Sequence, residues 1–369
     1  MLKKNQLFSA FTLRDLCLPN RVVMAPMTRN FSPNHVPGDD VAKYYQRRAE
    51  GGVGLIITEG TCVNHIGSNC YPNVPYIYGK ESVLGWRRVV DSVHQAGGKI
   101  AAQLWHVGAV RKMGMPPNPD INGFGPSGMN VPGKQNRNVM TIEDIDQVIS
   151  AFVEAAKTSK EIGFDAIELH GAHGYLLDQF FWSGTNQRND KYAGSIKKRC
   201  EFVCEIIRSI RSELGSNFPI ILRWSQWKMQ NYEAKLAHSP QELETFLAPL
   251  VDSGIDIFHC SQRRFWDPEF KENDLNLAGW VKKICGKPTI TVGSIGLDAD
   301  FISNPSQRGF SEAGPANLAE LLDRLDREEF DLIAVGRALI SNPDWATHVK
   351  NNEEGKIMAF KKEHLGTLV

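Results

Sequence analysis

The chain lacks several features that would each define a class of protein. None of its 369 residues belong to an apolar run of the roughly 18 residues that span a bilayer, and residues 1–16 lack the apolar core of a signal peptide. Lysine plus arginine equals aspartate plus glutamate, at 42 each, so no overall field favours nucleic acid or an anionic membrane. We therefore expect a soluble cytoplasmic protein acting on a small molecule, without nucleic acid or membrane as a partner. Whether it is a monomer or a homodimer stays open.

Cysteines do not form a paired framework. There are seven, an odd number, spread from Cys17 to Cys285, which favours reduced thiols. Cys200 and Cys204 lie four residues apart on a predicted helix, but no second pair lies at the spacing of metal ligands. We expect no metal site.

What the chain does have is a repeating alternation of strand and helix patterns. Near-continuous apolar runs typical of buried parallel strands occur at 22–25, 55–58, 100–104, 166–169, 220–222, 255–258, 289–292 and 332–335. The clearest helices are 141–163, with Thr141 and Asp144 as an N-terminal cap, and 195–214, with Gly215 beyond its end. Eight repeats suggest either a (β/α)₈ barrel or an open doubly wound sheet.

The first strand-to-helix turn decides between these two folds. It carries Pro26-Met27-Thr28 where a dinucleotide-binding open sheet would have G-x-G-x-x-G. A barrel of this length is ordinarily a single domain, so the prediction is a (β/α)₈ TIM barrel spanning residues 1–369. The irregular segments 107–140 and 296–314 are then loops on its catalytic face.

The most informative polar cluster follows the fourth predicted strand. His170, His173 and Tyr175 leave this strand together, and two imidazoles could bind an oxygen while the phenol supplies a proton. One histidine could instead brace the loop. A metal bound by the two histidines is disfavoured, because no carboxylate or third histidine lies beside them at ligand spacing.

Glycine turns follow predicted strands seven and eight, where many barrels bind a phosphate through backbone N–H groups. Gly293 and Gly336 would allow a close approach, Ser294 could donate a hydrogen bond, and Arg337 could form a bidentate pair. This pairing predicts a phosphorylated ligand such as FMN.

Six segments together resemble a known family, the old yellow enzymes, which are FMN-containing reductases of activated alkenes. They are His170-Gly-Ala-His-Gly-Tyr175, Asn186-Gln-Arg-Asn-Asp-Lys-Tyr-Ala-Gly-Ser195, Ala25-Pro-Met-Thr-Arg29, Thr58-Glu-Gly60, Gln103-Leu-Trp-His-Val-Gly108 and Ala334-Val-Gly-Arg337. The resemblance implies that FMN is bound without a covalent link and borders Pro26, Met27 and Gly60. It also implies that Thr28 approaches the flavin C4 carbonyl, Gln103 bonds the pyrimidine edge, and Arg223 faces the N1/C2 region.

The resemblance also implies a ping-pong reaction, with NAD(P)H and the alkene using one pocket in turn. His170 and His173 would bind the substrate carbonyl oxygen, hydride would pass from flavin N5 to the β-carbon, and Tyr175 would protonate the α-carbon. Trp105 and Trp266 are candidate substrate-binding residues. Three charged or polar residues of the signature are expected to brace a loop rather than react: Arg188, Asp190 and Tyr192.

The chain departs from the family at two places. Ala193 stands where glycine is usual. In Trp224-Ser-Gln-Trp227, Trp224 and Gln226 stand where the family usually has a smaller residue and a proline, which puts substrate scope in doubt. A flavin reductase of the same fold acting on a nitro compound, nitrate ester or quinone is the main alternative. A flavin-free phosphosugar isomerase or aldolase would need a lysine or glutamate base at the strand ends, and a non-catalytic flavin-binding protein would not need the His170, His173 and Tyr175 set.

Overall fold

A computed structural model describes residues 4–271, 273–301 and 311–369. Within these ranges eight parallel strands pair in chain order, and the last pairs with the first, which closes a barrel. They are β3 (Val22–Met24), β4 (Leu55–Ile57), β6 (Lys99–Trp105), β9 (Ala166–His173), β10 (Ile220–Lys228), β11 (Ile257–Ser261), β12 (Thr289–Val292) and β13 (Leu332–Val335). The predicted (β/α)₈ barrel is confirmed.

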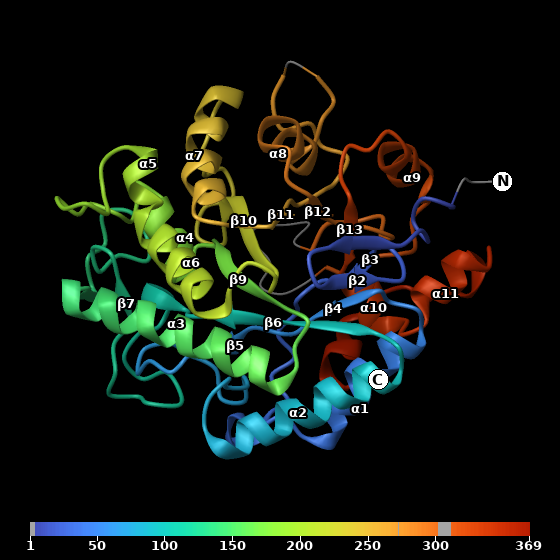
Figure 1. The fold of residues 1–369 in the computed structure, drawn as a ribbon, viewed down its shortest axis with the longest axis horizontal. Helices are drawn as coiled ribbons and strands as arrows, with labels where there is room; N and C mark the ends of the chain where they lie inside the picture. Colours follow the sequence, from blue (N-terminus) through green and yellow to red (C-terminus); the bar gives the residue numbers. More distant parts are fainter. Residues whose placement is uncertain (1–3, 272, 302–310) are drawn as a thin grey trace.

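Helices surround the barrel (Figure 1). They are α1 (Asp39–Glu50), α2 (Lys80–Gln95), α3 (Ile142–Ile162), α4 (Leu176–Phe181), α5 (Ile196–Arg199), α6 (Glu201–Leu214), α7 (Pro240–Asp252), α8 (Leu277–Cys285), α9 (Ala319–Asp326), α10 (Arg337–Ser341) and α11 (Trp345–Lys350). Thr141 caps α3 as predicted, because its side chain accepts from the Asp144 N–H at 3.1 Å. The predicted helix 195–214 is divided at Cys200, whose N–H donates to both Ile196 and Lys197 carbonyls and tightens the turn.

Short elements complete the loops and the barrel ends. They are β1 (Phe11–Leu13), β2 (Leu16–Leu18), β5 (Thr61–Cys62), β7 (Phe124–Gly125), β8 (Asn138–Val139), η1 (Pro33–His35), η2 (Gly108–Val110), η3 (Glu354–Lys356) and η4 (Lys362–Gly366). The predicted loop 107–140 therefore contains η2, β7 and β8. Of the predicted loop 296–314, residues 302–310 lie outside the described residues.

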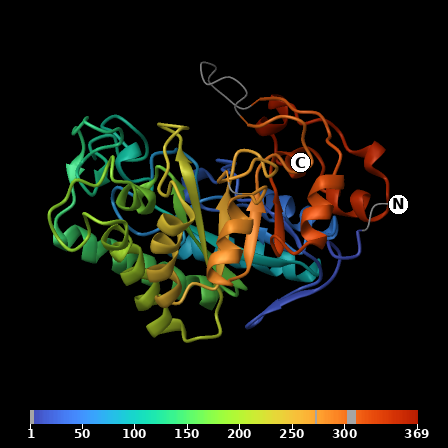
Figure 2. The same ribbon diagram turned by 90° about the horizontal axis from the view of Figure 1, so that it is seen from above.

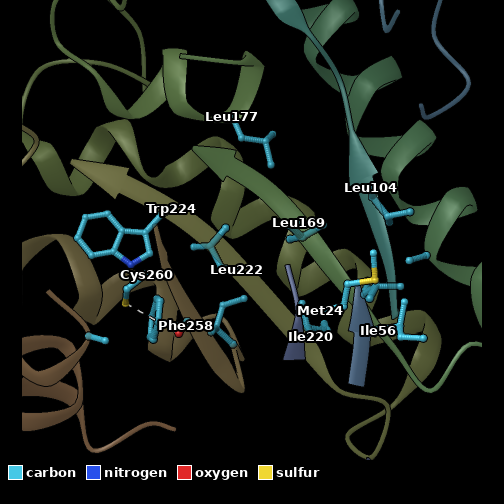
Figure 3. Close-up of a cluster of buried hydrophobic side chains, with 14 of the residues drawn as sticks. Met24, Ile56, Leu104, Leu169, Leu177, Ile220, Leu222, Trp224, Phe258 and Cys260 are labelled. Atoms are coloured by element: carbon cyan, nitrogen blue, oxygen red, sulfur yellow. Dashed lines mark hydrogen bonds between the residues drawn. The ribbon is translucent and has the colours of Figure 1, made fainter. Parts of the chain in front are cut away.

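Strand side chains alternate between two cores. Outward residues such as Leu169, Leu222 and Trp224 belong to the large cluster that packs against the helices (Figure 3). Inward residues form a separate apolar cluster, which the β1–β2 hairpin joins through Phe11 and Leu16. This hairpin projects at the lower edge of the molecule in Figure 2. Because the side-chain period is two, the next inward positions toward the carboxyl ends of the strands hold the polar residues of the candidate site.

Candidate active site

A cavity of about 540 Å³ opens at the carboxyl ends of the strands. It is lined by most of the residues singled out from the sequence: Pro26, Met27, Thr28, Gln103, Trp105, His170, His173, Tyr175, Arg223, Gly293, Ser294, Gly336 and Arg337. Segments far apart in the chain thus converge at the face where barrel enzymes carry their active sites.

Two predicted site residues do not line this cavity. Gly60 lies against Trp105, and a Cβ on Gly60 would come 2.4 Å from Cε3 of that indole. The absence of a side chain at Gly60 therefore makes room for the Trp105 indole, and Gly60 itself does not border the cavity. Trp266 packs edge-on against Phe265 at 5.1 Å between ring centroids, and its carbonyl accepts from Arg324 at 3.4 Å. Trp266 is thus not among the residues that line the cavity, contrary to the expectation that it covers the substrate.

The two histidines lie on strand β9, which continues four residues beyond the predicted end. Their ring centroids are 5.3 Å apart, and Tyr175 lies 5.1 Å from His170. His173 has a backbone φ of 66°, in the left-handed region that residues other than glycine rarely adopt. Its N–H donates to Ser225 Oγ at 3.0 Å, and its Nε2 lies 2.7 Å from Ser261 Oγ. These contacts hold the imidazole in one place.

Burial keeps this cluster uncharged. It lowers the pKa values of His170 and His173 well below their usual range, and the Arg223 cation lowers them further. It raises the pKa of the Tyr175 phenol, an effect to which neighbouring Tyr71 adds. At neutral pH each imidazole therefore carries a single N–H and the phenol keeps its proton. His170 Nδ1 is buried without a hydrogen-bond partner among the described residues.

A buried cation and an amide form the floor of the cavity. The guanidinium of Arg223 contacts Pro26 O and Ser261 Oγ, each at 3.5 Å, and its Nε is buried without a partner in the described chain. Burial lowers the pKa of Arg223 to about 10, which still leaves it charged at neutral pH. Gln103 Nε2 donates to Glu168 Oε1 at 2.8 Å. The unpartnered N–H of Arg223 Nε is a buried hydrogen-bond donor, which matches an electron-rich ligand.

The opposite end of the cavity carries the two glycine turns. Gly293 has φ 154°, and a Cβ there would lie 3.0 Å from the Gln262 carbonyl oxygen. Ser294 Oγ lies 3.1 and 3.2 Å from the Arg263 and Ala299 carbonyl oxygens, either of which can accept its single O–H. Arg337 donates to the carbonyls of Ala299, Asp300 and Ser311. Both side chains thus brace the neighbouring loops, while the backbone of the turns borders the cavity.

Sequence reasoning missed several cavity residues. Tyr71 places its hydroxyl 3.4 Å from that of Tyr175, and Leu365 reaches the cavity from η4. Neither carries a motif. Ser261 could have been found, because it follows Ile257 and His259 at the inward positions of β11.

The two residues that depart from the family, Trp224 and Gln226, do not line the cavity. Trp224 is fully buried and packs outward on Phe246 at 4.9 Å. Gln226 accepts from the N–H groups of Leu236 and Ala237. The neighbouring Trp227 does line the cavity, where it stacks on His173 at 4.5 Å.

The signature loop has the predicted bracing role. Arg188 pairs with Asp190 at 2.6 Å and donates to the Pro126 carbonyl at 3.0 Å. Tyr192 donates to Glu205 at 2.8 Å. In the described residues, no three His, Cys, Asp or Glu side chains gather as a metal site would require. No helix in the same part of the chain has the length and apolar character needed to cross a membrane.

Comparisons with known proteins match nearly the whole chain. The pattern of the NADH:flavin oxidoreductase / NADH oxidase family matches residues 6–355. "Putative 12-oxophytodienoate reductase 2" of Oryza sativa subsp. japonica is 30% identical over 351 residues, covering 92% of this chain and 85% of that protein. The NADH oxidase of Thermoanaerobacter brockii is 31% identical over 360 residues, and this chain spans 52% of it. Morphinone reductase in complex with tetrahydroNAD superposes with a TM-score of 0.81 at 26% identity, covering 97% of this chain and 93% of that one.

Fold, site and comparisons together define an NAD(P)H-dependent flavin oxidoreductase built on a (β/α)₈ barrel. The chain belongs to the NADH:flavin oxidoreductase / NADH oxidase family, that of the old yellow enzymes.

Proposed function

We propose that this protein reduces the activated C=C bond of α,β-unsaturated carbonyl compounds in the cytoplasm, using NADH or NADPH and a non-covalently held FMN. FMN, when bound, supplies the two-electron chemistry by taking a hydride from the nicotinamide and passing it to the alkene. Nicotinamide and alkene would use the cavity in turn, which gives ping-pong kinetics.

The observation that carries the proposal is the convergence of three neutral hydrogen-bonding groups at one end of the cavity. His170 and His173 each retain one N–H because burial and Arg223 prevent a second protonation. Such donors polarise a carbonyl oxygen without protonating it. Tyr175 keeps the proton that the α-carbon needs, since burial raises the pKa of its phenol.

The residues on the cavity floor and at the glycine turns fit a flavin nucleotide. The unpaired Nε of buried Arg223 matches the electron-rich edge of the ring system, and Gln103 and Thr28 supply polar groups beside it. Backbone at Gly293 and Gly336 borders the far end, where a phosphate would be bound. The cation of Arg337 lies at the same end.

The test is the visible spectrum of the purified protein under anaerobic conditions. A yellow protein that bleaches with NADH or NADPH and regains its colour with 2-cyclohexenone supports the proposal. Bleaching without recovery by the enone, but with recovery by a nitro compound, nitrate ester or quinone, would assign a different acceptor. A protein that takes up no FMN would overturn the proposal altogether.

A further inference from the structure

A carboxyl group lies inside the barrel below the candidate active site. Glu168 belongs to β9, two residues before His170, and is fully buried. Its Oε1 accepts from Gln103 Nε2 at 2.8 Å, and its Oε2 lies 2.6 Å from His259 Nδ1. It does not line the cavity, whereas Gln103 does.

These two contacts fix the orientation of the amide. A carboxylate only accepts hydrogen bonds, so the NH₂ end of Gln103 has to face Glu168. Burial lowers the pKa of His259, so its imidazole is neutral. Its Nδ1 carries the hydrogen and donates it in the hydrogen bond to Glu168. The backbone N–H of Gln103 also has a partner, because it donates to Thr58 Oγ1 at 3.0 Å. Without Glu168 the amide could turn over, because its two ends have nearly the same shape.

The carboxylate also balances the charge of the cavity floor. Arg223 follows Ile221 on β10, and Ile221 lies directly opposite Glu168 in the sheet register. The negative charge of Glu168 favours the protonated Arg223 and opposes the effect of burial on its pKa. A buried anion below the floor thus acts electrostatically on the buried cation of Arg223, in a region where charges interact strongly.

We infer that Glu168 is a positioning residue for the flavin, which sets the binding of its pyrimidine edge through Gln103 and holds its reduction potential down by offsetting Arg223. The inference depends on FMN binding, as the proposed function does, but not on the identity of the acceptor.

The first test is FMN affinity, measured by titrating apoprotein with FMN and following flavin fluorescence. Glu168→Gln is expected to weaken binding about 10- to 100-fold, which is the typical effect of losing a hydrogen bond to a charged group. Gln103→Ala should weaken binding similarly, and the double variant should be little worse than either single one, since both act through one contact. Additive losses would overturn the positioning role.

The second test is the midpoint potential of the bound flavin, measured by anaerobic dye-coupled titration. Glu168→Gln removes the negative charge and should raise the potential, whereas Glu168→Asp keeps the charge and should leave the potential near that of the parent while weakening FMN binding. A potential that Glu168→Gln leaves unchanged would overturn the electrostatic role. Urea unfolding of the apoproteins identifies a folding defect, and Glu168→Asp carries the affinity test if Glu168→Gln does not fold.

The parent protein separates this inference from the proposed function. If the parent binds FMN and its colour returns only with a quinone, ene-reduction fails while both measurements on Glu168 stand.

Discussion

Two consecutive layers of the barrel interior differ completely in character. The layer nearer the β1–β2 hairpin is apolar and includes Ala101, Ala166, Ile221 and Ile257. Two residues further along the same four strands, the layer consists of Gln103, Glu168, Arg223 and His259. The sheet register places Gln103 opposite Glu168 and Arg223 opposite His259. Between β9 and β10 the register is offset by two residues, so that Glu168 lies opposite Ile221, where the two layers meet.

The difference shows how one set of strands serves two purposes. The apolar layer closes the barrel by burial and needs no particular partner for each side chain. The polar layer is buried as deeply, so each of its groups needs a specific partner or a ligand. Substitutions in the apolar layer should therefore change stability, while those in or above the polar layer should change binding and chemistry.

The largest effect is expected above the polar layer, at Tyr175. Tyr175→Phe removes the proton donor and should slow alkene reduction about 10²- to 10⁴-fold, the usual contribution of general acid catalysis. Flavin reduction by NAD(P)H should stay within about twofold, since it does not need that proton. Stopped-flow measurement of the two half-reactions separates them. Equal slowing of both would remove Tyr175 from the proposed role.

The opposite pattern is expected in the apolar layer, at Ile221. Ile221→Ala creates a cavity in the barrel interior and should lower the free energy of unfolding by about 2–5 kcal/mol. Ile221→Val, as a matched control, should cost about 0.5–1.5 kcal/mol. Urea unfolding measures both. Activity per folded molecule should persist, and its loss in Ile221→Val would show that the two layers are not independent.

Another buried carboxyl group, that of Glu59, sharpens the comparison because it lies outside both layers. Glu59 follows β4, and its Oε2 accepts the backbone N–H groups of Arg29 and Asn30 at 2.9 and 3.0 Å. Burial raises the pKa of Glu59 from 4.5 to about 7. A raised folded pKa means that stability is fully present below about pH 4.5 and falls as the pH rises toward 7.

Glu59→Gln keeps the acceptor oxygen and removes the ionisation. At about 1.4 kcal/mol for each pH unit between 4.5 and about 7, it should gain up to about 3 kcal/mol over the parent at pH 8, and no such gain at pH 4.5. Urea unfolding across this range measures the difference. The exposed Glu233→Gln is the control, and a gain at Glu59 that does not depend on pH would contradict the assigned cause.

The apolar layer could be predicted from the sequence, and the polar layer only in part. Each of the eight apolar runs forms a strand, because β-branched and aliphatic residues buried on both faces leave a continuous signal. The signal ends where inward residues turn polar, so β10 was predicted to end at residue 222 and instead continues to Lys228. His170 and Tyr175 were visible through their motif. Glu168 and Tyr71 were not, because tertiary packing alone gives them their partners.

The smallest effect is expected at Trp227, which lies beside His173 in the cavity and next to Gln226, a residue at which this chain departs from its family. Its indole stacks on His173 at 4.5 Å and its Nε1 donates to the Ser261 carbonyl at 3.1 Å. Trp227→Leu removes the stacked ring and should weaken binding of a phenol about 2- to 10-fold, the usual value of an aromatic pair. Trp227→Phe keeps a ring on His173 and should bind nearly as the parent does. Titration of the flavin spectrum with the phenol measures both. Equal weakening in the two variants would mean that Trp227 acts through its bond to Ser261 instead, so that the orientation of His173 depends on the β11 wall rather than on stacking.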